Sequence, residues 1–218
     1  MLAATLSIAA VLPAAAQDTD VRDPKAKSLL LELKAKNEQM KSAELDFSYN
    51  LFHEEGIDET RDGNLLMQGK QYKVDMAGQT IISDGKALYT IIDDVELQIN
   101  NLPDPNDASQ SWMNPQTMLN IDEKDFKYKH EGTATDGGKT VDVIKLFPVD
   151  AANATFHTVI LNVDKAAMQP TSIVIKAKDG NRYTLTIKKM LPNAPVPAGS
   201  FNVNPDDSKW EDVIDLRD

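Results

Sequence analysis

The feature that most constrains the fold of this chain is an alternation of apolar and polar residues, punctuated by Asp-Gly turns. It is clearest in residues 81–92, where two β-rich apolar runs flank Asp84 and Gly85, the strongest short-range hairpin signal that a sequence offers. Successive residues of a strand point to opposite faces of a sheet, so the apolar residues of this hairpin need a cover on at least one face.

The same period of two recurs through most of the chain. It starts at Glu44, pauses after about residue 101, resumes near Phe126 and continues to about Lys189, with tight turns between the runs. This rhythm predicts a mainly antiparallel β fold of about eleven strands. The apolar positions of the first strands are Leu45, Phe47, Tyr49, Leu51, Leu65, Met67, Tyr72, Val74, Met76, Tyr89, Ile91 and Leu97.

Two segments have helical rather than strand spacing. Asp23 and Pro24 mark the start of an amphipathic helix that ends near Met40 and carries Leu30 and Leu33 on its apolar stripe. A long connection then follows residue 102, and in a compact β domain such a connection is either a lid or a linker. Its Trp and Met content favours a short helical lid, with the apolar residues Trp112, Met113, Met118 and Leu119.

A single large sheet with one apolar face must curl over or close around something. If the helix and the insertion fill the concavity permanently, it is simply a core, which is the commoner outcome. If these covers can lift, the concavity becomes an apolar ligand pocket. The methionines suit the second alternative, because Met repacks readily around flexible chains.

The first sixteen residues differ from the rest. An apolar, alanine-rich run is followed by Pro13 and three alanines, as in the apolar region and cleavage site of a secretory signal peptide, although no Lys or Arg precedes the run. We therefore expect residues 1–16 to be a signal peptide and residues 17–218 to form a single domain outside the cytoplasm. The sequence has no cysteine, so no disulfide framework and no lipid-anchoring cysteine follow.

Charge and motif content disfavour several classes of function. The formal net charge of -11 argues against nucleic acid as a partner. His53, His130 and His157 are isolated, and neither the G-x-S-x-G nor the H-E-x-x-H motif nor a phosphate-binding glycine loop occurs. We expect a protein without catalytic residues, a metal site or a cofactor.

Three local patterns, taken together and in order, resemble the LolA family of periplasmic lipoprotein carriers. Residues 82–89 (ISDGKALY) are similar to the family's Asp-Gly-Lys hairpin, and residues 201–205 (FNVNP) to its Phe-containing element. Residues 210–217 (WEDVIDLR) resemble its C-terminal ending. The helix end near Met40 followed by residues 45–49 also matches the family's opening, so the resemblance covers essentially the whole mature chain.

The resemblance implies a fold and a function. The fold is an incomplete, half-open β-barrel covered by an N-terminal helix and a short helical lid. The function is that of a monomeric periplasmic carrier in a Gram-negative bacterium, which holds the acyl chains of lipoproteins in its cavity. Such a carrier takes its cargo from an inner-membrane, ATP-driven extractor and passes it to an outer-membrane acceptor without chemistry. The apolar residues of the strands, the helix and the lid named above would line that cavity.

The resemblance also raises one specific question and leaves two alternatives. Where the best-known members carry an arginine that bonds the lid, this chain has Gln68, which makes Gln68 the candidate for the lid latch; Lys70 could serve only with a shift in alignment. One alternative is an envelope module that senses lipids or lipoproteins on the same fold, although such regulators usually carry a second domain. The other is an enzyme acting on envelope lipids, which would need convergent polar groups that the sequence does not display.

Overall fold

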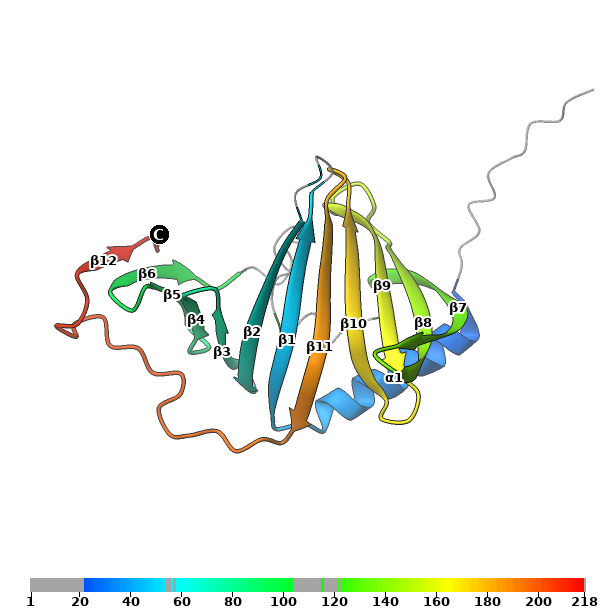
Figure 1. The fold of residues 1–218 in the computed structure, drawn as a ribbon, viewed down its shortest axis with the longest axis horizontal. Helices are drawn as coiled ribbons and strands as arrows, with labels where there is room; N and C mark the ends of the chain where they lie inside the picture. Colours follow the sequence, from blue (N-terminus) through cyan, green and yellow to red (C-terminus); the bar gives the residue numbers. More distant parts are fainter. Residues whose placement is uncertain are drawn as a thin grey trace, which may run out of the picture.

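The chain is described by a computed structural model, which covers residues 22–53, 56, 58–103, 115, 121 and 123–217. Within these residues one helix, α1 (Pro24–Glu38), precedes twelve strands (Figure 1). The strands are β1 (Ser42–Phe52), β2 (Asp58–Gln68), β3 (Gln71–Met76), β4 (Gln79–Ser83), β5 (Ala87–Ile92), β6 (Glu96–Asn101), β7 (Phe126–Asp136), β8 (Lys139–Pro148), β9 (Phe156–Asp164), β10 (Gln169–Ala177), β11 (Arg182–Pro192) and β12 (Asp212–Asp215).

All twelve strands belong to one sheet, in the order β12-β6-β5-β4-β3-β2-β1-β11-β10-β9-β8-β7. Neighbouring strands are antiparallel, except that β12 pairs with β6 in parallel. The two edge strands, β12 and β7, are not paired with each other, so the sheet stays open. The predicted mainly antiparallel, half-open fold is confirmed. Sequence reasoning missed β12, because four residues at the end of a polar tail show too little alternation to identify a strand.

The predicted hairpin forms between β4 and β5. The Asp84 carboxylate accepts hydrogen bonds from the backbone N–H groups of Lys86 (2.7 Å) and Ala87 (2.8 Å), which closes the turn. Gly85 has a φ of 88°, a left-handed conformation that residues with a side chain rarely adopt. The Asp-Gly pair therefore fixes the turn through two different properties, a side-chain acceptor and a permissive backbone.

Helix α1 begins where the sequence predicts it. The Asp23 side chain accepts hydrogen bonds from the backbone N–H groups of Lys25 and Ala26, and Pro24 occupies the first turn. The buried face of α1 packs on the β7–β10 part of the sheet. The resulting cluster of buried apolar side chains, here called the helix cluster, comprises Ala26, Leu30, Leu33, Tyr128, Ile144, Leu146, Ala154, Phe156, Val159, Leu161, Val163, Ile173 and Ile175.

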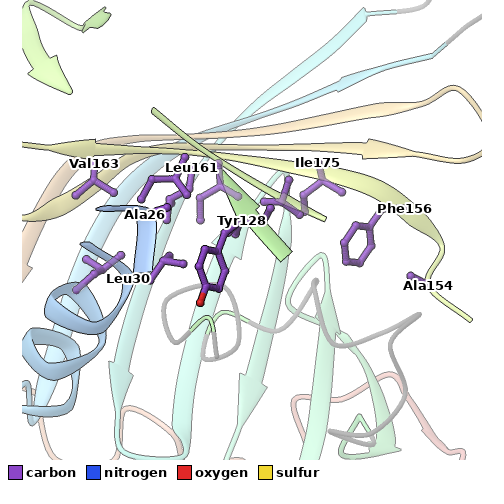
Figure 2. Close-up of a cluster of buried hydrophobic side chains, with 13 residues drawn as sticks. Ala26, Leu30, Tyr128, Ala154, Phe156, Leu161, Val163 and Ile175 are labelled. Atoms are coloured by element: carbon purple, nitrogen blue, oxygen red, sulfur yellow. The ribbon is translucent and has the colours of Figure 1, made fainter. Parts of the chain in front are cut away.

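Figure 2 shows Ala26 and Leu30 of α1 beside the strand residues Val163, Leu161 and Tyr128. The helix is also fixed at its N-terminal end, because the backbone N–H of Asp23 donates to the carbonyl of Tyr128 (3.1 Å). The face of the sheet on which α1 lies is called the helix-side face below. No helix in the described part of the chain is long and apolar enough to cross a membrane.

The opposite face of the sheet has a cover of its own. The segment between β11 and β12, residues 193–211, packs with Val196, Phe201, Val203 and Trp210 on this face of β4–β6 and is called the strap. Figure 1 shows the strap leaving the end of β11 and reaching β12 beyond β6. The buried residues of this strap cluster are Ile82, Ala87, Tyr89, Ile91, Leu97, Ile99 and Phe201.

Candidate functional site

The central strands carry a continuous apolar surface on the helix-side face. Cross-strand partners share a face, and the register places Phe47 opposite Ile187 on β11 and opposite Gly63 on β2. Following the register from β1 to β11 on one side, and from β1 through β2 to β3 on the other, gives one surface over these four strands, here called the apolar face. Its members are Leu45, Phe47, Tyr49, Leu65, Met67, Tyr72, Val74, Met76, Leu185, Ile187 and Met190.

The apolar face adjoins the helix cluster but is less buried. Leu185 packs against both groups of side chains, which joins the two surfaces. Leu45, Leu65 and Tyr72 are buried, whereas Met67 and many of the others are only half-buried. A row of half-buried apolar side chains is what a surface for an apolar ligand requires.

Gly63 allows an unusually close approach at the centre of this face. A Cβ atom at Gly63 would lie 2.5 Å from Cζ of Phe47 and 2.9 Å from the carbonyl oxygen of Asp75. The Phe47 ring therefore lies directly on the β2 backbone, in space that a side chain would fill.

A pocket of about 350 Å³ lies at one end of the apolar face, between the end of α1 and the adjoining ends of β1 and β2. Its lining combines apolar side chains of the face with charged residues of the helix end. The lining residues are Lys34, Asn37, Glu38, Met40, Lys41, Ser42, Ala43, Met67 and Gly69.

The wall of this pocket is fastened to the start of the strap. The Ser42 hydroxyl donates to the carbonyl of Ala194 (2.6 Å), and the backbone N–H of Lys41 donates to the Asn193 side-chain oxygen (2.9 Å). The backbone N–H of Asn193 in turn donates to the Ser42 carbonyl (2.7 Å). Three hydrogen bonds thus hold the α1–β1 junction against the exit of β11.

The other end of the apolar face is polar and aromatic. Arg61 on β2 pairs across from Tyr49 on β1, so it lies on the helix-side face. The Tyr49 and Tyr183 rings are 6.4 Å apart, and the Arg61 Nη2 atom lies 3.0 Å from Oε2 of Glu59. Burial raises the pKa of the Tyr49 hydroxyl to about 12; Tyr183 adds to the rise, and the Arg61 charge opposes it.

A second group of ionisable side chains lies near the first turn of α1. The His130 Nε2 and Asp142 Oδ1 atoms are 2.7 Å apart, and Lys25 Nζ lies 3.5 Å from the same oxygen. The Asp142 side chain is buried and the His130 side chain is half-buried. Burial pushes the pKa of Asp142 upward, but the His130 hydrogen bond and the charges of Lys165 and Lys25 outweigh it and lower the pKa. The cluster joins β7, β8 and α1. No set of three or more His, Cys, Asp or Glu side chains suited to a metal ion occurs among the described residues.

The structure brings together most of the residues that the sequence assigned to a cavity. The strand residues from Leu45 to Met76 lie on the apolar face, with Leu51 on the same side near its polar end. Leu30 and Leu33, on the buried face of α1, belong to the adjoining helix cluster. Trp112, Met113, Met118, Leu119 and the proposed lid fall outside the described residues.

Three predicted cavity residues lie on the other face, which is a correction. Tyr89, Ile91 and Leu97 belong to the strap cluster. The register shows why. Val74 on the apolar face pairs with Ile81, so Ile81 shares that face. Ile82 follows Ile81 and points to the opposite face, and its partner Tyr89 points there with it. This hairpin is apolar at both odd and even positions, so its alternation cannot decide which set faces which side.

The Gln68 side chain is also placed differently from the expectation. It is exposed, and it points away from the face that Met67 shares. The cation that β2 does place on the helix-side face is Arg61, which sequence reasoning missed. Residues two apart on a strand share a face, so Leu65 and Gly63 place Arg61 on the same face, and this signal was present in the sequence.

Comparison with models of known protein families and with curated proteins gives no match. Solved structures do match. An uncharacterized conserved protein from Thermus thermophilus is 10% identical over 88% of this chain and 99% of its own, with a TM-score of 0.56. Lipoprotein LppX from Mycobacterium tuberculosis is 14% identical over 78% of this chain and 98% of its own, with a TM-score of 0.48. A LolA superfamily protein from Nitrosomonas europaea is 15% identical over 82% and 97%, with a TM-score of 0.43.

At these identities the likeness concerns the fold. The Thermus protein shares the architecture over nearly the whole of both chains. A LolA superfamily protein is among the solved structures that match.

Proposed function

We propose that this chain is a lipoprotein carrier, whose apolar face binds acyl chains and shields them from water. The observation that carries the proposal is the apolar face itself. It is continuous over β1, β2, β3 and β11, largely half-buried, and adjoined by a pocket of about 350 Å³. In the helix cluster, buried side chains outnumber the half-buried ones packed against them, as expected of a core, whereas on the apolar face the half-buried side chains outnumber the buried ones.

The energetics of acyl chains fit a carrier. Burying each CH₂ group contributes about 0.8 kcal/mol, so one chain anchors a protein to a membrane only reversibly, and several chains anchor it stably. A lipoprotein with several chains therefore leaves a membrane only if another apolar surface replaces the bilayer. Half-buried side chains offer such a surface while keeping the affinity low enough for release.

The finer parts of the proposal concern route and place. The carrier works in the periplasm of a Gram-negative bacterium, after removal of residues 1–16. It accepts lipoproteins from an ATP-driven extractor in the inner membrane and delivers them to an acceptor in the outer membrane. It acts without catalysis. The three sequence patterns shared with the LolA family support this assignment.

The first test is release of a lipoprotein from washed spheroplasts by the purified mature protein. Wild-type protein should release lipoprotein into the supernatant, and mass spectrometry of gently purified protein should detect bound acylated cargo. A carrier assignment does not survive if the folded protein releases nothing and is always recovered without lipid.

Two neighbouring residues of β11 provide a matched pair of variants. Ile187 lies on the apolar face, and Thr186 lies on the opposite face and is exposed. Ile187→Glu should abolish release, because it places a carboxylate where apolar chains would lie. Thr186→Glu adds the same charge one residue away and should leave release intact. Equal activity of both folded variants would contradict the proposed face.

A further inference from the structure

The apolar face has an asymmetry along the strands that acyl-chain binding alone does not explain. At the pocket end, Ala43 lies opposite Met67, and the face is apolar. At the β1–β2 hairpin end, Tyr49 lies opposite Arg61, and Leu51 lies opposite Glu59. One strand pair therefore runs from the apolar wall of a pocket, whose other wall carries charged residues of the helix end, to a guanidinium group on the same side of the sheet.

We propose that this face also binds anionic lipids, with the phosphate or carboxylate of the head at Arg61 and the chains lying along β1 and β2 toward Met67. The inference rests on the proposed apolar binding face and adds a second ligand class to it. A site with an arginine at one end and a pocket at the other would recognise both parts of such a molecule and fix its direction.

The chemistry of Arg61 suits an oxyanion. A guanidinium group is charged at all relevant pH values and presents its donors in a planar fork that matches a phosphate or carboxylate. Tyr49, directly across the strand pair, is protonated at neutral pH like any tyrosine, and burial raises the pKa of its hydroxyl further, so it is available as a hydrogen-bond donor. Charge-assisted hydrogen bonds of this kind are stronger than neutral ones.

Glu59 holds the place of the anion in this structure. Its Oε2 atom lies 3.0 Å from Nη2 of Arg61, and the two side chains are 45% and 52% exposed. An ion pair at this exposure contributes little, because water screens both charges. A lipid head that brings its own apolar chains can therefore replace the Glu59 carboxylate at Arg61.

The dimensions agree with the length of a lipid chain. From Tyr49 to Ala43 the strand advances about 20 Å, at roughly 3.3 Å per residue. One leaflet of a bilayer is about 15 Å deep in its hydrocarbon part, half of the usual ~30 Å. A chain that starts beside Arg61 thus passes Phe47 and Leu45 and ends at the pocket.

The test uses the mature protein and displacement of the uncharged apolar dye N-phenyl-1-naphthylamine. The competitors are dioctanoyl phosphatidic acid, dioctanoylglycerol with the same chains and no charge, and glycerol 3-phosphate with the same head and no chains. Decanoate serves as the carboxylate counterpart. Wild-type protein should prefer phosphatidic acid to dioctanoylglycerol by about tenfold, the effect of one charge-assisted hydrogen bond, and should ignore glycerol 3-phosphate.

Arg61→Gln should remove this preference while leaving the affinity for dioctanoylglycerol unchanged. Arg182→Gln is the matched control, because Arg182 lies on the opposite face. Its strand partner Phe52 follows Leu51 of the helix-side face and so points away from that face, and the Arg182 guanidinium lies 4.8 Å from the centre of the Phe52 ring. Circular dichroism melting curves establish that both variants fold.

The outcomes separate this inference from the proposed function. A preference that persists in Arg61→Gln, or that is lost equally in Arg182→Gln, overturns the assignment of the head to Arg61 but leaves acyl-chain binding in place. Binding of glycerol 3-phosphate as tight as that of phosphatidic acid would identify a free-anion site and overturn it as well. If neither lipid displaces the dye from wild-type protein, the apolar face is not a binding surface and both proposals fail.

Discussion

The contact between Gly63 and Phe47 predicts that Gly63→Ala destabilises the protein through a specific steric conflict. The new Cβ would lie 2.5 Å from Cζ of Phe47 and 2.9 Å from the Asp75 carbonyl oxygen, both well inside normal contact distance. Overpacking of this kind typically costs about 1–3 kcal/mol. Since the ring makes the shorter contact, we expect about 2 kcal/mol, with the Phe47 side chain rather than the β2 backbone giving way.

A double-mutant cycle measures how much of the free-energy cost of Gly63→Ala comes from the Phe47 ring rather than from the backbone. Urea unfolding of wild type, Gly63→Ala, Phe47→Leu and the double variant gives the coupling free energy. Leucine does not reach the position of the Phe47 Cζ atom, so the alanine should cost about 1 kcal/mol less in the Phe47→Leu background. Costs that simply add, within about 0.5 kcal/mol, would refute the argument.

A second glycine provides a control with a different cause of strain. Gly69 has a φ of 57°, and a Cβ there would meet nothing within 4 Å. Gly69→Ala should therefore cost about 1 kcal/mol through its backbone conformation alone. Its cost should be the same with Phe47 or Leu at position 47, because no side-chain contact is involved.

Three further predictions follow from burial and charge. Leu97 is fully buried in the strap cluster, so Leu97→Ala should lower the free energy of unfolding in urea by about 2–5 kcal/mol, while the folded fraction still binds lipoprotein. Loss of binding without loss of stability would contradict the placement of Leu97 on the face opposite the apolar face. Because the His130 hydrogen bond and nearby cations lower the pKa of Asp142 against its burial, Asp142 stabilises the fold above about pH 4 and ceases to as pH falls through the lowered pKa. Asp142→Asn should flatten the acid side of the stability–pH curve, and an unchanged acid limb would count against this role. Burial raises the pKa of Tyr49 to about 12 against the opposing Arg61 charge, so Arg61→Gln should raise it further in a phenolate absorbance titration, and a fall would contradict their pairing.

The elements of the fold could be predicted because their signals are local. Asp23 and Pro24 start the helix through contacts within one turn. The Asp84 and Gly85 hairpin closes through its own side chain and backbone. The order of the strands is a different matter. The pairing of β1 with β11 joins residues far apart in the chain, and no local pattern encodes it.

The candidate site was predictable only where one face of a strand is polar. On β1, polar residues alternate with Leu45 and Phe47, and the structure confirms that these two share a face. On β4 and β5 both faces are apolar, because the strap covers one of them, and Tyr89 was consequently assigned to the wrong side. Arg61 escaped notice because a charged residue in a strand usually indicates the solvated face.

The three patterns that resemble the LolA family lie in one region of the structure. Ile82 and Tyr89 of the hairpin pack against Phe201 of the second pattern, and the third pattern contains β12, which pairs with β6. These residues hold the strap against the sheet, on the face opposite the proposed site. These three patterns therefore encode the scaffold. Residues 45–49, which match the family's opening, instead supply Leu45, Phe47 and Tyr49 to the apolar face.

The position of β1 at the centre of the sheet has a consequence for how the molecule assembles. The strands β1 to β6 form one run of local hairpins, and β7 to β11 form a second. Among the described strands, the β1–β11 pairing is the only strand pairing that joins these two runs. Contacts of such long sequence separation form late, because closing a long loop must precede them. The apolar face spans this pairing, since Phe47 of β1 and Ile187 of β11 both belong to it. On the function proposed above, a chain that has not yet formed the β1–β11 pairing has an incomplete lipid site, and a lipid that binds across this pairing would hold the two runs together.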